Sequence, residues 1–214
     1  MAHMAATYLG KMISNYLNGV HVRDIMHGVA WALETREMDT MLKAAEKLTP
    51  STSKRKKHLP HTPTFISAIR QQLDLEAPLD VAIFACLTTC FYASARLGEF
   101  TVCTLVSFKP NKHVAIQNLS HDQDQNGLKV TVPHLPTTKA ASIESEDVYW
   151  VSQDGDTDPM AALQNHLHIN QQSEASYLFA YQAKHICHPL TKSKFLKRVA
   201  NTVCATDLEP LQSK

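Results

Sequence analysis

The strongest constraint on the fold is one almost entirely apolar segment near the middle of the chain. Pro78 opens it, and a helix is predicted from Leu79 to Ala95 with apolar residues on nearly every face. Proline suits the first helical position, because its missing N–H would have no partner there in any case. A helix that is apolar all round must be enclosed by other elements. The sequence therefore predicts a domain built around this helix.

The residues before the apolar segment are predicted to be helical. Apolar residues recur at three- and four-residue steps over residues 9–17, and Gly19 is expected to interrupt that helix. A second, short helix is expected to close at Gly28, and a third is predicted over residues 34–48. These helices contain too few apolar residues to predict an independent domain.

A change of composition separates the two parts of the chain. Residues 49–62 are rich in Pro, Ser, Thr and cations and have no periodicity, which is typical of a linker. We therefore expect a helical segment over residues 1–48, a basic linker over 49–62 and a larger domain over 63–214.

Within the larger domain the spacing of apolar residues changes from one typical of helices to one typical of strands, and then back. Residues 128–132 alternate between apolar and polar, and Val148–Val151 form a second predicted strand. Other elements are helices over 63–73, 159–171 and 192–205, capped by Thr62, Asp158 and Thr191, and a short extended piece over 177–181. The predicted fold class is mainly α with a small antiparallel β-sheet.

Composition restricts the classes of function. Apolar residues make up 44% of the chain and charged residues 19%, which excludes a disordered chain. No apolar run approaches the roughly 18 residues that span a bilayer, so no membrane contact is predicted. The cysteines match neither a CxxC pair nor a disulfide framework, which favours a reducing intracellular compartment.

The net charge of +1 averages opposed regions. Cations dominate from Lys43 to Arg70 and again from Lys184 to Arg198, whereas acids dominate from Ser120 to Met160. Two basic stretches around an acidic one indicate a surface that binds a polyanion. The alternative is that the charges only keep separate surfaces soluble.

The strongest indication of a functional site lies where the apolar helix ends. The run FYASARLGEF places Arg96 there, and a guanidinium needs anionic or carbonyl partners because it cannot lose its charge. Glu99 follows three residues later and could be that partner. A structural ion pair and a binding site are both open at this point.

The run ARLGEF after an apolar helix, followed by a strand with a lysine in the next connection, resembles the tyrosine recombinase (phage integrase) family. Within that family the chain is most similar to fungal DNA breaking–rejoining enzymes related to Crypton-type mobile elements. Further matching runs are LTPSTSKRKK, PLDVAIFACLTTCFYASARLGEFTV, NGLKVTVPHLPTTK, DGDTDPMAAL and HPLTKSKFLKRV. The resemblance covers residues 9–212. It implies that residues 1–48 are a partial core-binding domain and that residues 63–214 are the N-terminal part of a truncated catalytic domain. It implies double-stranded DNA as the partner, a nuclear or otherwise intracellular location and no cofactor.

The resemblance also implies roles for particular residues. In this family a tyrosine attacks a DNA phosphate, two arginines hold its non-bridging oxygens, and a hairpin lysine protonates the leaving oxygen. Arg96 matches the first arginine, with Glu99 supporting it, and Lys139 matches the hairpin lysine. An arginine fork suits a phosphate that gains charge in its transition state. Lys139 could equally be an ordinary solvated lysine.

Two groups of cations are candidate contacts to DNA phosphates, which give affinity without sequence information. One group lies in the linker and the other in the last helix: Lys54, Arg55, Lys56 and Lys57, and Lys194, Lys197 and Arg198. Solubility, or a nuclear-localisation patch in the linker, is the alternative.

The departures from the family pattern concern catalysis. The family continues beyond a segment like 208–212 into a His-x-x-Arg motif and the tyrosine nucleophile, whereas this sequence stops at Lys214. His185–His188 has the spacing of that motif but lies too early and has histidine in place of arginine. Tyrosines that precede the missing motifs are no nucleophile: Tyr149, Tyr177 and Tyr181. We therefore expect a truncated, integrase-like DNA-binding protein that cannot cleave and rejoin DNA alone.

Two other functions remain open. A domesticated recombinase fold could serve as a protein- or ligand-binding module, and His121 with Asp122 and Asp124 could belong to a metal-dependent hydrolase or nuclease. Soft zinc ligands could come from His185, Cys187 and His188 with His166 or His168. Because residues two apart on a helix point away from each other, no metal site is predicted. A homo-oligomer on DNA is left open.

Overall fold

The computed structural model describes residues 7–53, 61–138 and 145–204. The chain divides into two compact units, Met1–His58 and Leu59–Lys214. None of the helices in these described ranges is long and apolar enough to cross a membrane.

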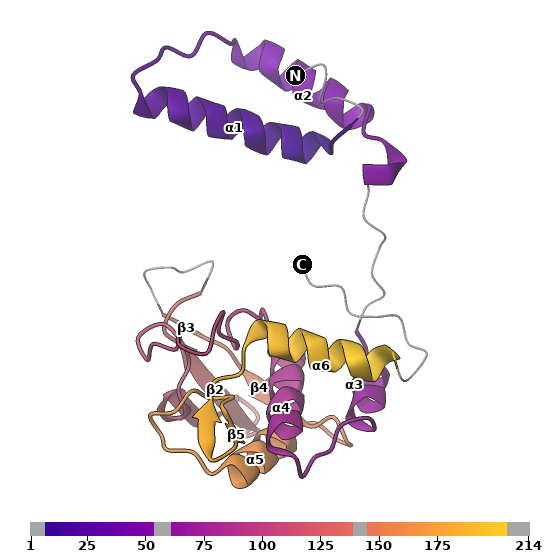
Figure 1. Ribbon diagram of the computed structural model, residues 1–214, viewed down its shortest axis with the longest axis vertical. Coiled ribbons are helices and arrows are strands. Elements are labelled where there is room, and N and C mark those ends of the chain that lie inside the picture. Colours follow the sequence, from indigo (N-terminus) through magenta and orange to yellow (C-terminus); the bar gives the residue numbers. More distant parts are fainter. Residues whose placement is uncertain (1–6, 54–60, 139–144, 205–214) are drawn as a thin grey trace. The chain divides into compact units, whose positions relative to one another are not determined.

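The first unit contains two helices that lie side by side. These are α1 (Gly10–Met26) and α2 (Thr35–Lys47), followed by a single 3-10 turn, η1 (Ser51–Ser53) (Figure 1). The start of α1 contacts the end of α2, where a Cβ added to Gly10 would lie 2.7 Å from the Cα of Glu46. The absence of a side chain at Gly10 therefore permits this close approach.

The expected interruption at Gly19 is wrong. Helix α1 continues through Gly19 to Met26, so there is no separate helix that closes at Gly28. One glycine in a helix interior costs about 1 kcal/mol, which packing along the rest of a helix can outweigh. Gly28 instead lies in the loop after α1 with φ 67°. The helix predicted over residues 34–48 is confirmed as α2.

The second unit is built around α4 (Pro78–Tyr92), which confirms the prediction from the apolar segment. Residues 80–86 of this helix are all buried, and α5 (Pro159–Asn170) packs along it (Figure 1). The helix ends three residues before its predicted end. Ser94 turns the chain there with φ 52°, and the turn starts the segment that carries Arg96.

The remaining α-helices of this unit begin at the predicted caps. They are α3 (Pro63–Arg70) and α6 (Lys192–Cys204). A side-chain oxygen in each cap accepts backbone N–H groups of the first turn, which have no partner within the helix. The contacts are Thr62 with Phe65 (3.2 Å), Asp158 with Met160 and Ala161 (3.1 Å each) and Thr191 with Lys194 (3.2 Å).

A small antiparallel sheet has β2 (Lys129–Leu135) at its centre, which confirms the alternating pattern and extends it by three residues. Strand β1 (Leu119–Gln123) pairs along one edge of β2, and β3 (Glu146–Asp147) and β4 (Trp150–Val151) pair along the other. Strand β1 has four exposed residues and no apolar alternation, so the sequence did not predict it. The fold class, mainly α with a small antiparallel sheet, is confirmed.

A second pair of strands forms a hairpin that was not predicted. Strands β5 (Tyr181–Ala183) and β6 (Ile186–His188) are joined by Lys184 and His185, with φ 49° and 63°. Two residues with positive φ give a turn whose twist matches the flanking strands. Only the last residue of the extended piece predicted over 177–181 belongs to a strand.

Candidate functional site

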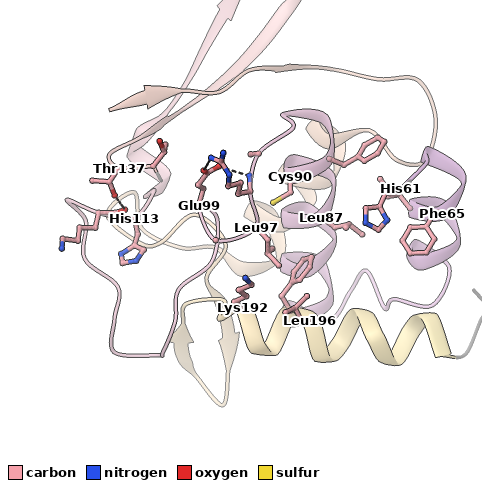
Figure 2. Close-up of a pocket in the computed structure, with 18 residues that line it drawn as sticks. His61, Phe65, Leu87, Cys90, Leu97, Glu99, His113, Thr137, Lys192 and Leu196 are labelled. Atoms are coloured by element: carbon pink, nitrogen blue, oxygen red, sulfur yellow. Dashed lines mark hydrogen bonds and ion pairs between the residues drawn. The ribbon is translucent and has the colours of Figure 1, made fainter. Parts of the chain in front are cut away.

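A cavity of about 1000 Å³ lies between α3, α4, α6 and the loops that face them (Figure 2). Its lining is of two kinds. Figure 2 shows Glu99, His113 and Thr137 toward one side of the view and His61, Phe65 and Leu87 toward the other, with Lys192 and Leu196 next to each other between them. The cavity therefore combines a polar, cationic part with an apolar part.

Arg96 belongs to the polar part, and its position is set by Glu99. The Arg96 backbone N–H donates to Glu99 Oε2 at 2.8 Å, and its Nη1 donates to Oε1 at 3.1 Å. The Glu99 side chain is only 10% exposed, whereas that of Arg96 is 63% exposed. A mostly enclosed carboxylate thus holds a guanidinium that is itself largely exposed to water. The ion pair expected from the sequence is present, and it leaves Arg96 accessible within a cavity.

Lys112 and His113 line the same cavity, and the sequence reasoning missed both. Their loop is fastened in two places. The Lys109 N–H donates to His113 Nδ1 at 3.0 Å, and Thr137 Oγ1 donates to the Lys112 carbonyl at 3.1 Å. Nothing in the sequence indicated these residues, because their loop has no periodicity and comes near Arg96 only through the fold.

Lys192 is a further cation of the lining, at the start of α6. Its N–H donates to the Val102 carbonyl at 3.0 Å, and Val102 N–H donates to the Leu190 carbonyl at 3.1 Å. These bonds join the segment after Arg96 to the start of α6. The sequence counted Lys192 within a basic stretch but gave no reason to single it out.

Two groups of predicted site residues lie outside the described residues. Lys139 is one of them, although its sequence neighbours Thr137 and Thr138 line the cavity. The linker group of Lys54, Arg55, Lys56 and Lys57 is the other. Their assignments stay predictions.

The cations of α6 have different surroundings. Lys194 and Lys197 are exposed. Arg198 instead donates from Nε and Nη2 to the Asp80 carboxylate of α4 at 2.8 and 2.6 Å, and from Nη2 to the Gln72 carbonyl at 3.3 Å. The hydrogen bonds to Asp80 raise the pKa of Arg198 above its usual range. Arg198 therefore ties α6 to α4, and its contact with DNA stays a prediction.

The histidine and cysteine residues considered as zinc ligands do not come together. His166 is fully buried, with Nε2 donating to the Leu178 carbonyl at 2.9 Å and Nδ1 accepting from Asn170 Nδ2 at 3.0 Å. Burial lowers the pKa of this imidazole to about 4, so it is neutral at pH 7. Across residues 7–53, 61–138 and 145–204, no three His, Cys, Asp or Glu side chains are placed to hold a metal ion.

Comparison with known proteins finds only remote similarities. No protein-family model matches the chain, and no curated protein sequence matches it. Among solved structures, an FLP recombinase–Holliday junction complex is 13% identical with a TM-score of 0.42, covering 91% of this chain and 42% of that chain. A Flpe–Holliday junction complex is 14% identical with a TM-score of 0.45, covering 85% and 44%. This chain thus spans less than half the length of either.

Proposed function

We propose that this chain is a DNA-binding module of tyrosine-recombinase type that holds a backbone phosphate at Arg96. The observation that carries the proposal is an exposed guanidinium, held by the mostly enclosed Glu99 carboxylate, in a cavity that Lys112 and Lys192 also line. Cations from three separate segments of the chain thus line one cavity, and its one acidic residue among the described residues, Glu99, is already bound by Arg96.

The chemistry of the cavity suits a phosphodiester. A guanidinium presents a planar fork of donors that matches two phosphate oxygens, and Lys112 and Lys192 add charge without demanding a fixed geometry. By the family resemblance, we propose Lys139 as a further contact to this phosphate, the remnant of a catalytic lysine in a chain that does not itself cleave DNA. Lys194, Lys197 and the linker cations contact neighbouring phosphates along the duplex.

We propose further that the chain alone does not cleave DNA. No described tyrosine lines the cavity. Tyr177 is buried, and burial raises the pKa of its hydroxyl well above the usual range, while the Tyr92 hydroxyl is hydrogen-bonded to Thr157 at 2.8 Å. A nicked suicide duplex incubated with the chain should give no covalent adduct on a denaturing gel. Such an adduct would contradict this part of the proposal and leave the binding proposal intact.

DNA binding is tested by fluorescence anisotropy with a labelled short duplex over a series of salt concentrations. We expect affinity to fall steeply with salt, because each neutralised phosphate releases counterions. Arg96→Ala should weaken binding about tenfold or more and reduce the salt slope by about 1, because one charge-assisted phosphate contact is lost. Arg96→Lys should recover only part of the loss.

The matched control is Lys129→Ala, which removes an exposed cation that does not line the cavity. It should retain near-normal affinity. Equal losses of DNA affinity in Arg96→Ala and Lys129→Ala would show that affinity depends only on the total positive charge. The assignment of a phosphate site to Arg96 would then be wrong.

The apolar part of the cavity favours a second candidate function, a protein- or ligand-binding module. Side chains from three helices form this part: Phe65, Ile66, Leu87, Phe91, Phe195 and Leu196. A phosphate leaves such a surface unused, whereas an amphipathic ligand with one anionic group would occupy both parts. Its affinity would change little with salt, which separates it from the first candidate.

Three wider features belong to the proposal as well. Origin from a fungal, Crypton-type mobile element rests on the sequence resemblance. A nuclear location would follow from DNA binding and from the Lys54–Lys57 cluster. A homo-oligomer on DNA would raise affinity on duplexes that carry two adjacent sites.

A further inference from the structure

The Arg96 cavity has an apolar part that a phosphate contact leaves uncovered. Phe65 of α3, Leu87 of α4 and Leu196 of α6 line this part, and each of them is only half-buried. They pack against the core on one side and offer apolar surface to the cavity on the other. Removal of such surface from water is favourable. A ligand that covers it should therefore bind more tightly than a bare phosphate.

The polar part of the cavity carries an excess of positive charge. Three cationic side chains line it: Arg96, Lys112 and Lys192. Glu99 is the one acidic side chain of the lining among the described residues, and Arg96 binds it. Within that part of the chain neither Lys112 nor Lys192 forms an ion pair with a carboxylate. The described lining therefore carries three positive charges against one negative charge.

This excess of two positive charges matches a phosphate monoester better than it matches one phosphate of a DNA backbone. A backbone phosphodiester carries a single negative charge, whereas a phosphate monoester carries about −1.5 to −2 at pH 7. A monoester also presents three terminal oxygens. The guanidinium fork of Arg96 and two ammonium groups therefore each find an acceptor on it.

The cationic and apolar parts adjoin each other, so one small molecule can contact both. Lys192 and Leu196 are about one helical turn apart on α6 and lie next to each other in the lining (Figure 2). Leu97 directly follows Arg96 and lines the cavity as well. The cavity volume of about 1000 Å³ is at the upper end of the range of roughly 300–1,000 Å³ that is typical of small-molecule sites. There is room for a phosphate head and a chain of several carbons together.

A second hollow, of about 480 Å³ and lined by residues of β1, β2 and β4, provides a contrast. Its charged lining residues are both acidic, Asp122 and Asp124, and Tyr149 lines it as well. A lining of this charge repels a phosphate. The combination of positive charge with apolar surface therefore distinguishes the Arg96 cavity from this hollow.

We propose that the Arg96 cavity binds a phosphate monoester with a single alkyl chain, that is, a single-chain phospholipid in monomeric form. Its phosphate lies against Arg96 and the two lysines, and its chain lies along the apolar side chains of α3, α4 and α6. The inference rests on the phosphate site of the proposed function and adds a second ligand to it. The lipid is then a competitor of DNA for Arg96.

Isothermal titration calorimetry of the full chain with butyl phosphate, octyl phosphate and 1-octanol tests the proposal, with every probe below its micelle-forming concentration. Each buried methylene adds roughly fourfold to affinity, so octyl phosphate should bind about tenfold or more tightly than butyl phosphate. 1-Octanol, which lacks the phosphate, should bind about tenfold or more weakly than octyl phosphate. Equal affinities within either comparison would overturn the proposal.

Two pairs of variants test whether the ligand occupies the cavity, with circular dichroism as the check on folding. Leu196→Ala should weaken octyl phosphate binding about fivefold, while Leu105→Ala, at an exposed leucine outside the lining, should not change it. Lys112→Gln should also weaken binding about fivefold or more, while Lys129→Gln should not. Equal effects within either pair would show that the ligand binds elsewhere, and the proposal would be wrong.

Competition with DNA separates this inference from the function on which it rests. In the anisotropy assay, saturating octyl phosphate should displace the labelled duplex, whereas butyl phosphate at the same concentration should not. Octyl phosphate that binds without displacing DNA would overturn the placement of its phosphate at Arg96. Unaltered DNA affinity in Arg96→Ala would instead contradict the proposed function, and the chain-length preference measured by calorimetry does not depend on that result.

Discussion

The two units of the chain differ sharply in how they bury apolar side chains. In α1 and α2 the buried positions are Gly10, Ile13, Leu17 and Ala45, while Met26 is 79% exposed. In the second unit a continuous core surrounds α4, and large side chains such as Phe100 and Phe179 are fully buried. Both units are helical, so helix content does not account for the difference.

The difference shows that the stability of a unit depends on how many helices and strands pack against its central helix, rather than on helix formation itself. Each of two paired helices offers one face to the other, so most of their surface stays in water. In unit 2, helices, a sheet and a hairpin contribute residues to the core around α4. Because packing supplies most of the stability of a helix in a protein, we expect unit 2 to dominate the stability of the chain.

The largest expected effect comes from the core of unit 2. Phe179→Ala should lower the free energy of unfolding by about 3–5 kcal/mol, because it removes a fully buried ring that contacts Phe100 edge to face. Met26→Ala in unit 1 should change it by less than about 0.5 kcal/mol. Urea unfolding followed by far-ultraviolet circular dichroism, which reports the helices of both units, measures both. Comparable losses would break the comparison between the units.

The next effect is a dependence of stability on pH that arises from His166 in unit 2. The pKa of His166 falls from 6.5 in the unfolded chain to about 4 in the folded protein, because burial disfavours its charged form. The unfolded state therefore binds more protons between these values. Stability from this group is complete above pH 6.5 and should fall by about 3 kcal/mol as pH drops to 4.

This pH dependence is measured by urea unfolding of the parent and of two variants across that range. His168→Gln changes an exposed histidine on the same helix and should keep the full dependence. His166→Gln should lower stability at pH 7 and remove most of the dependence between pH 6.5 and 4. A slope that persists in His166→Gln would assign the effect to another group.

A smaller loss of stability is expected when Arg198 of α6 is replaced, but not when its neighbour Lys197 is. Arg198→Ala should cost about 2 kcal/mol, because it leaves the Asp80 carboxylate, only 7% exposed, with a single backbone donor, the Asp74 N–H. This figure is below the 3–5 kcal/mol of a fully buried pair, since the Arg198 side chain is 31% exposed. Lys197→Ala should leave stability within about 0.5 kcal/mol of the parent.

Thermal unfolding and DNA anisotropy on the same two variants sharpen this contrast. We expect Lys197→Ala to weaken DNA binding without loss of stability. Arg198→Ala should lower stability with at most a small direct effect on binding. If the two variants have the same stability, the ion pair between Arg198 and Asp80 does not stabilise the packing of α6 on α4.

Local patterns in the sequence were sufficient for the elements that depend on near neighbours. The apolar segment predicted α4, and Thr62, Asp158 and Thr191 marked helix starts, because a cap acts within three residues of itself. Gly19 failed as a helix end because its local cost is small compared with packing elsewhere along α1. Strand β1 was missed because its pairing with β2, rather than its own pattern, makes it a strand.

The candidate site was predictable only at its centre. Arg96 and Glu99 are three residues apart, so their pairing follows from the sequence. Lys112, His113 and Lys192 come from segments that lie later in the sequence than Arg96, and no periodic pattern links them to it. The bond from Thr137 to Lys112 and the bonds between Val102 and the start of α6 bring these segments together.

The sequence by itself determined the central helix, the helix starts, the mainly α class and one arginine–glutamate pair. Each of these depends on residues within a few positions of one another, or on the need to enclose an apolar helix. Only the tertiary structure decided that Arg198 binds the Asp80 carboxylate and that a cationic cavity forms around Arg96. It also decided that Asp122 and Tyr149 line a separate acidic hollow. Those outcomes depend on contacts between distant segments, which no local pattern encodes.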